Sequence, residues 1–256
     1  MAYNSKKAGE YWNKRIDQTD KTHAVLNMGY PNAVNAAYNK WESVLVFKYL
    51  GNPKNQKILD VACGVGRYTI PLAKAKAELV GIDISEQMLA RCAEGLKENG
   101  LQGRVRLLKT SASEIPLETT FDNILCMELL FHLPSDVQQK VVREFARLLK
   151  KDGHVMFTTS NNERVFGAKK TPTTWEEGYY CEFMDTATTL KMFEKEGFKI
   201  EHVFSYTFSS LLLARFINFL KPLYPISTWL DWKVSRFGFM DRKLGNHFLV
   251  IAKKIR

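Results

Sequence analysis

Cysteine is scarce in this 256-residue sequence, and its spacing fits no metal site. The four cysteines are Cys63, Cys92, Cys126 and Cys181. No pair of them has the spacing of a zinc motif, and each lies in or beside an apolar run. We therefore expect buried free thiols, no bound metal and a reducing, cytoplasmic environment.

Long hydrophobic runs are also missing. The longest uncharged apolar stretch, residues 203–214, is shorter than the roughly 20 residues that a membrane-spanning helix needs. Residues 1–15 are polar and charged with no apolar stretch behind them, which is unlike a signal peptide. With 45% hydrophobic and 25% charged residues, the composition is that of a folded globular protein, and the length suits one α/β domain over 1–256.

Acidic residues are in short supply. The chain has 37 lysines and arginines against 27 acidic residues, a formal net charge of +10. Such an excess favours anionic partners, namely nucleic acid, an acidic membrane surface or a phosphorylated substrate, or it is spread over an ordinary basic surface. Because the basic residues form no clear stripe and no RNA-binding domain is appended, nucleic acid is not the expected partner.

From residue 33 onward, apolar runs of strand length alternate with helical patterns. The expected strands are 57–61, 79–82, 105–108, 121–127, 155–159, 198–204 and 248–252, and the expected helices are 33–50, 67–74, 86–99, 136–150 and 186–196. This alternation predicts an α/β fold, a parallel sheet covered by helices on both faces. Ligands of such sheets bind beyond the carboxyl ends of the strands.

The strongest local signal is a strand, a glycine turn and a helix over residues 58–69. Gly64 and Gly66 let the backbone turn sharply and approach a ligand closely, and the next helix points its positive end at that ligand. Asp83 ends the second strand, where a carboxylate can accept both hydroxyls of a ribose. A dinucleotide site is disfavoured, because Thr69 occupies the position of the third glycine and Asp60 would have no role.

These motifs resemble those of the class I S-adenosylmethionine-dependent methyltransferases, particularly the small-molecule branch. Residues 60–66 correspond to the first family motif, and Asp83 corresponds to the acidic residue after the second strand. Residues 121–134 and 145–157 resemble the later motifs in the right order, and the likeness covers roughly 45–205. It implies a Rossmann-like, doubly wound sheet of seven mostly parallel strands with an antiparallel last strand.

The resemblance also implies a cofactor, S-adenosyl-L-methionine, and a set of contacts to it. These contacts are assigned to Tyr11, Asp60, Ala62, Gly64, Gly66, Asp83, Ile84, Ser111 and Met127. Two of them depart from the family pattern: Ala62 stands where glycine is frequent, and Ser111 stands where an aspartate often bonds the adenine. Tyr11 and Trp12 lie in a segment that commonly folds over the cofactor, where aromatic faces attract a sulfonium or simply pack.

The acceptor side is less defined. His132 follows the fourth strand, where family members place residues that face the transferred methyl group, so it acts as a general base, orients the acceptor or only packs the wall. Glu128 lines the pocket or caps the turn. The implied reaction is methyl transfer to an oxygen or nitrogen of a small molecule, lipid or glycan intermediate. The alternative is an RNA-directed methyltransferase or a non-catalytic nucleic-acid-binding cofactor module.

Two segments flank or interrupt the expected core of 51–206 and 246–256. Residues 1–50 are expected to form a helical arm or lid. Residues 207–245 separate the last two strands and are expected to form a helical insertion near the substrate site. Their aromatic and basic residues suit a membrane surface or an amphiphilic substrate, or a lid that closes over a soluble one.

Overall fold

A computed structural model describes residues 3–17, 32–160, 173–176, 179–182, 184–206, 226 and 247–256. Apart from residue 226, the expected insertion at 207–245 lies outside the described residues. Within the described part of the chain, no helix is long and apolar enough to cross a membrane. All four cysteines are free and buried, which confirms the expected thiols.

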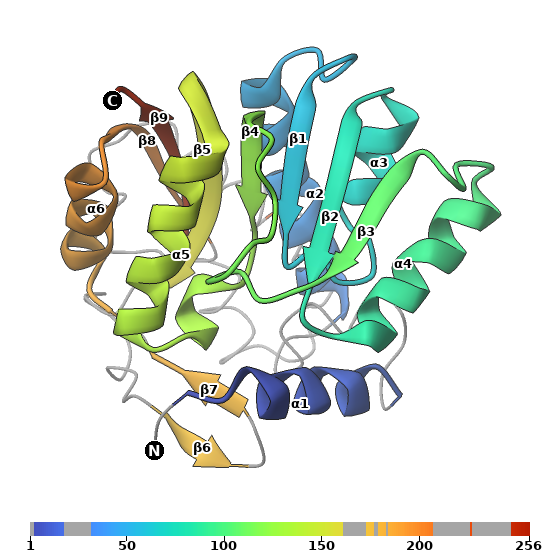
Figure 1. The fold of residues 1–256 in the computed structure, drawn as a ribbon, viewed down its shortest axis with the longest axis horizontal. Coiled ribbons are helices and arrows are strands. Elements are labelled where there is room, and N and C mark those ends of the chain that lie inside the picture. The colour runs from blue at the N-terminus through green and yellow to red at the C-terminus, as the bar shows by residue number, and fades with distance from the viewer. Residues whose placement is uncertain are drawn as a thin grey trace.

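The molecule is organised around a seven-stranded sheet with the order β3-β2-β1-β4-β5-β9-β8 (Figure 1). Its strands are β1 (Lys57–Val61), β2 (Glu78–Asp83), β3 (Val105–Lys109), β4 (Phe121–Cys126), β5 (Leu149–Ser160), β8 (Phe198–Tyr206) and β9 (His247–Lys254). The first five strands pair in parallel, and β9 is antiparallel to both β5 and β8. The mostly parallel sheet with an antiparallel last strand is therefore confirmed.

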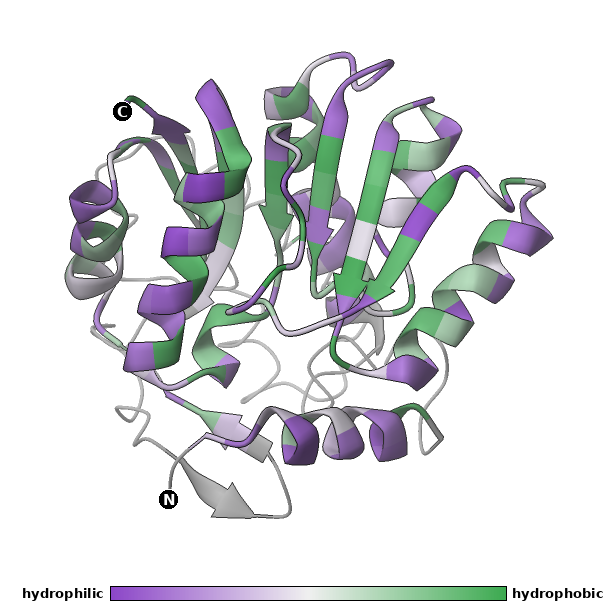
Figure 2. Ribbon diagram, in the orientation of Figure 1, coloured by the Kyte–Doolittle hydropathy of each residue, from purple (hydrophilic) through white to green (hydrophobic). Residues whose placement is uncertain are grey.

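Helices cover both faces of this sheet. The strands alternate in side-chain direction, so in β9 Phe248 and Val250 join one apolar cluster and Leu249 and Ile251 join the other. The first cluster includes residues of α5 (Ser135–Leu148) and α6 (Thr186–Lys195), and the second those of α2 (Asn32–Leu50), α3 (Thr69–Lys74) and α4 (Glu86–Glu98). Figure 2 shows the strands mostly hydrophobic and the outward side of α5 hydrophilic.

Several predicted boundaries are displaced, and the largest error lies between α5 and β5, which was expected to begin at residue 155. The helix expected to run to residue 150 ends at Leu148, and β5 begins at Leu149, which is extended (ψ 137°), fully buried and paired with Phe121. Burial of the Leu149 side chain against the sheet outweighs continuation of the helix. Gly153 lies inside β5, where a Cβ atom would come within 2.7 Å of the Asp122 carbonyl oxygen.

Two elements at the carboxyl edge of the sheet position the site. The helix α1 (Ser5–Asp17) and the hairpin of β6 (Thr173–Glu176) and β7 (Tyr179–Cys181) lie beyond the strand ends (Figure 1). α1 is tied to the start of α4, because Asn13 Oδ1 accepts hydrogen bonds from Ser85 Oγ at 2.7 Å and from the Gln87 amide at 3.2 Å. The sequence pattern did not predict the hairpin.

Candidate functional site

A cavity of about 430 Å³ opens at the carboxyl edge of the sheet. Its walls come from α1, the end of β1 and the turn after it, the end of β2, the start of α4, the segments that follow β2, β3 and β4, β7 and the first residue of β9. The expected site residues that line it are Tyr11, Asp60, Ala62, Gly64, Asp83, Ile84, Ser111, Met127 and His132. The strands β1, β2, β3 and β4, together with α1, thus deliver almost the whole predicted set to one place.

Asp83 is held rigidly at the end of β2. Its carboxylate accepts the Gly64 amide and the Ser85 amide, each at 2.9 Å. Burial raises the pKa of Asp83 to about 6, and these amide bonds oppose that shift. Because a carboxylate offers about four acceptor positions, the two oxygens can still accept the hydroxyls of a ribose.

Asp60 is the second buried carboxylate of the cavity. Its Oδ2 accepts a hydrogen bond from the Thr69 hydroxyl, so the residue that replaces a third glycine orients Asp60. Burial raises the pKa of Asp60 to about 6, and the nearby charge of Asp83 adds to this effect. Two buried carboxylates that repel one another are stabilised by a cationic ligand, as the predicted role of Asp60 requires.

The backbone of the turn after β1 explains why glycine is frequent at the position of Ala62. Ala62 has a left-handed backbone (φ 57°), as does Gly64 (φ 53°), so a glycine fits the same position without a Cβ penalty. Gly66 does not line the cavity within the described residues. A Cβ atom there would lie 2.8 Å from Cys92 Sγ, so Gly66 allows α4 to pack closely against the turn.

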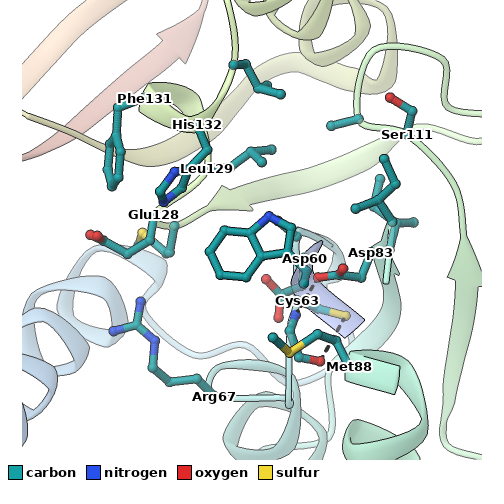
Figure 3. A pocket seen from close by; sticks show the side chains of 18 of the residues that line it. Asp60, Cys63, Arg67, Asp83, Met88, Ser111, Glu128, Leu129, Phe131 and His132 are labelled. Carbon is teal, nitrogen blue, oxygen red and sulfur yellow. Dashed lines mark hydrogen bonds between the residues drawn. The ribbon is translucent and has the colours of Figure 1, made fainter. Parts of the chain in front are cut away.

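Figure 3 shows Asp60, Asp83 and Ser111 on one side of the cavity and Glu128, Leu129, Phe131 and His132 on the other. Ser111 Oγ shares a hydrogen bond with Ser113 Oγ at 2.9 Å, and its contact with an adenine stays a prediction. The first side offers carboxylates and a hydroxyl, which suit a nucleoside. The second side offers His132 and the Glu128 carboxylate, which suit an acceptor.

α1 forms the roof over both sides. Tyr11, Trp12 and Arg15 line the cavity, with the Arg15 guanidinium 5.1 Å from the Trp12 ring centroid. The Trp12 ring meets the His132 ring edge-on at 5.2 Å. The aromatic pair expected to fold over the cofactor therefore faces the cavity, and Trp12 reaches the acceptor side.

His132 ends a short 3₁₀ helix, Leu130–His132. Its Nδ1 lies 3.1 Å from the Tyr180 carbonyl oxygen and 3.6 Å from Cys181 Sγ. If Nδ1 carries the proton that bonds this carbonyl, Nε2 is the basic nitrogen. Burial lowers the pKa of His132 to about 4, so the imidazole is neutral at physiological pH.

Sequence analysis missed a buried polar network behind the acceptor side. Glu42 of α2 is fully buried, accepts the Tyr68 hydroxyl at 2.5 Å and forms an ion pair with Arg67 Nη2 at 2.9 Å. Tyr38 of α2 donates to Glu128 Oε1 at 2.6 Å. The sequence held one signal for this network: Tyr38 and Glu42 are four residues apart, which places them on the same face of a helix.

Comparison with known proteins gives the same fold. The sequence profile described as a methyltransferase domain matches residues 58–153. A magnesium protoporphyrin IX methyltransferase from Synechocystis PCC 6803, solved with bound SAM, superposes with a TM-score of 0.64 at 17% identity, over 99% of this chain and 98% of that one. A [4+2]-cyclase superposes with a TM-score of 0.66 at 20% identity, over 99% of this chain and 97% of that one, so the architecture alone does not name a reaction.

Two curated relatives are named ubiquinone biosynthesis O-methyltransferase. The protein from Methylococcus capsulatus is 40% identical over 106 residues, which cover 41% of this chain and 44% of that protein, so the match spans less than half of its length. The protein from Thiobacillus denitrificans is 30% identical over 164 residues, 61% of this chain and 70% of that protein. With this coverage, the resemblance drawn from the motifs is confirmed, and the chain belongs to the class I S-adenosylmethionine-dependent methyltransferases.

Proposed function

We propose that this protein is an enzyme that transfers a methyl group from S-adenosyl-L-methionine to an oxygen or nitrogen nucleophile of a small molecule, lipid or glycan intermediate. The observation that carries the proposal is Asp83, whose two oxygens are fixed by the Gly64 and Ser85 amides while the side chain faces the cavity. The two relatives named ubiquinone biosynthesis O-methyltransferase support an oxygen nucleophile.

The residues present fit the cofactor. Asp83 would hold the ribose, Asp60 would face the cationic methionine end, and Ser111 and Ile84 would border the adenine. When bound, S-adenosylmethionine supplies an electrophilic methyl group on a cationic sulfur. The chain's own task is to align the acceptor, exclude water and remove a proton from a hydroxyl acceptor, with His132 as the proposed proton acceptor and α1 as the proposed lid.

Replacing Asp83 with alanine should weaken binding of S-adenosylhomocysteine by about 1–3 kcal/mol, or roughly 5–150-fold, because hydrogen bonds to a charged group are lost. Isothermal titration calorimetry measures this directly. The matched control is Asp152→Asn, which alters an exposed carboxylate on β5 and should leave the affinity unchanged. Equal affinity in wild type and Asp83→Ala, or binding of NADH without S-adenosylhomocysteine, would overturn the proposal.

The same site predicts a pH dependence. Since the pKa of Asp83 is raised to about 6 by burial, the charged carboxylate is lost as the pH falls through about 6, and cofactor affinity should fall with it. Protein stability should change in the opposite direction to cofactor affinity. Because the pKa of Asp83 is higher in the folded state than in the unfolded state, protonation favours the folded state. The free energy of unfolding should therefore decrease as the pH rises from about 4 to 6. Asp83→Asn should reduce both trends.

The segment 207–245 is proposed to contact the substrate side. β8 ends at Tyr206 and β9 begins at His247, these two residues are paired, and His247 lines the cavity. Both ends of the segment therefore leave the sheet beside the acceptor. Its aromatic and basic residues support a peripheral contact with an anionic membrane, or a lid for a soluble acceptor.

Vesicle flotation separates these two roles. Flotation with anionic vesicles that is lost in the Trp229→Ala and Trp232→Ala double variant is expected for a membrane contact. Activity lost in the same variant without flotation indicates the lid. Retention on heparin with a steep salt dependence would instead support the nucleic-acid alternative, whereas wild-type activity after removal of residues 209–243 would exclude both roles of the segment.

A further inference from the structure

Glu128 has an energetically unfavourable backbone conformation. It follows β4 directly, lines the cavity and has a left-handed backbone (φ 59°), a conformation that a residue with a side chain rarely adopts. Its amide donates to Thr158 Oγ1 at 2.6 Å, and Thr158 is fully buried in β5. The fold therefore determines where this carboxylate enters the cavity.

The carboxylate itself is oriented but not saturated. Oε1 accepts the Tyr38 hydroxyl at 2.6 Å, and Tyr38 is buried on α2. Among the residues that the structure describes, none donates a hydrogen bond to Oε2. Because an ionised carboxylate only accepts hydrogen bonds, Glu128 presents acceptor positions at the wall of the cavity.

The nearby Arg67 does not neutralise Glu128 by direct pairing. Its guanidinium forms an ion pair with the fully buried Glu42 at 2.9 Å and a hydrogen bond with Asn39 Oδ1 at 3.2 Å. The charges of Arg67 and Glu42 cancel, which leaves one negative charge at Glu128.

The cavity therefore differs in sign from the chain as a whole. The chain has a net charge of +10, yet among the residues that the structure describes the charged ones lining the cavity are Asp60, Asp83 and Glu128 against Arg15 and Arg67, with Arg67 offset by Glu42. A carboxylate or phosphate on the acceptor would meet an unfavourable field at Glu128, whereas a hydroxyl or ammonium group would be stabilised there.

Aromatic rings flank this carboxylate. Phe131 lies 4.6 Å from the His132 ring centroid and 6.1 Å from that of His247, and Trp12 contacts His132 from α1. These three residues and Trp12 line the cavity. These rings pack against one another and form an aromatic wall of the cavity, which suits an acceptor with an apolar, ring-like body and a polar edge.

Building on the proposed methyl transfer, we propose that Glu128, oriented by Tyr38, is the acceptor-binding residue of this enzyme. It selects acceptors with an apolar, ring-like body and a hydroxyl or amine hydrogen-bond donor, and it excludes acceptors that are anionic at that position. Tyr38 is a positioning residue that acts through Glu128.

The test compares three probes that share one ring. The full-length protein is first saturated with S-adenosylhomocysteine, and calorimetry verifies that the cofactor site is filled, so failure of the proposed cofactor site is detected separately. Binding of benzyl alcohol, benzylamine and benzoate is then measured by ligand-observed NMR. Wild type should bind benzylamine and benzyl alcohol at least about 10-fold more tightly than benzoate, as expected for hydrogen bonds to a charged group.

The variants decide the role of Glu128. Glu128→Gln should reduce that preference to within about threefold, with unchanged affinity for S-adenosylhomocysteine and an unchanged melting temperature. Tyr38→Phe should reduce the preference in part. The matched control is Glu78→Gln, because Glu78 is an exposed glutamate at the start of β2. This variant should retain the full preference for benzylamine and benzyl alcohol over benzoate. An equal preference in wild type and Glu128→Gln, or no preference of the wild type for the two donor probes over benzoate, would overturn the proposal.

Discussion

Replacing His132 with alanine is expected to lower turnover by about 10²–10⁴-fold, the usual effect of removing a general base. The expectation rests on the position of the ring: it lines the acceptor side of the cavity, with Nδ1 directed at the Tyr180 carbonyl oxygen. With Nδ1 as the donor to this carbonyl, Nε2 would be the nitrogen that takes the acceptor proton in the proposed reaction. Turnover is measured at saturating labelled S-adenosylmethionine with an acceptor identified by label transfer to small-molecule extracts.

The control for this experiment is His154→Ala, because His154 lies on β5 outside the lining of the cavity and pairs with Glu201 at 3.1 Å. Turnover in this variant should equal that of the wild type, and the affinity of both variants for S-adenosylhomocysteine should be nearly unchanged. A small loss in His132→Ala, or a loss confined to KM, would identify His132 as a wall residue. Full activity would remove it from the site.

The lowered pKa of His132 also predicts how turnover and stability change with pH. Because burial lowers it to about 4, a base at this position stays neutral, and turnover at saturating cofactor should decline only as the pH falls through about 4. A depressed histidine pKa also means that the folded state resists protonation. The free energy of unfolding should therefore decrease as the pH falls from about 6.5 toward 4, and His132→Ala should reduce this decrease.

Replacing Glu42 with alanine is expected to lower the free energy of unfolding by about 3–5 kcal/mol, since it leaves the Arg67 charge buried without its partner. The side chains of Arg67 and Glu42 are only 10% and 0% exposed, and the same carboxylate accepts the Tyr68 hydroxyl. For a chain of this size the loss corresponds to a melting temperature lower by about 6–20 °C, which differential scanning calorimetry measures.

The double variant Glu42→Leu with Arg67→Met tests the cause. Removing both charges and restoring apolar volume should be far less destabilising than Glu42→Ala alone, because an apolar pair of similar size commonly replaces a buried ion pair at little cost. A shift of less than about 2 °C in Glu42→Ala would mean that Arg67 finds another partner. Glu128 is the candidate, since its charge already acts on Arg67.

The sequence by itself determined the core of the fold and the cofactor side of the site. Most strands of the sheet contain a short apolar run, and α4 and α5 carry a clear period of 3.6 residues, so these local patterns survive in the folded chain. The glycine turn and Asp83 were predicted for a similar reason: consecutive parallel strands place their carboxyl ends at one edge. Gly64 and Asp83 indeed meet there at 2.9 Å.

Other features were decided only by the tertiary structure. The end of α5 at Leu148 depends on how Leu149 packs against the sheet, and the left-handed backbone at Glu128 depends on a hydrogen bond to Thr158, thirty residues away. The contact between Tyr38 and Glu128 joins residues ninety positions apart. Local patterns carry no information on such pairs, because their geometry arises only when α2 packs against the sheet. The proposed acceptor side of the cavity is built from contacts of this kind, and the proposed cofactor side from local motifs.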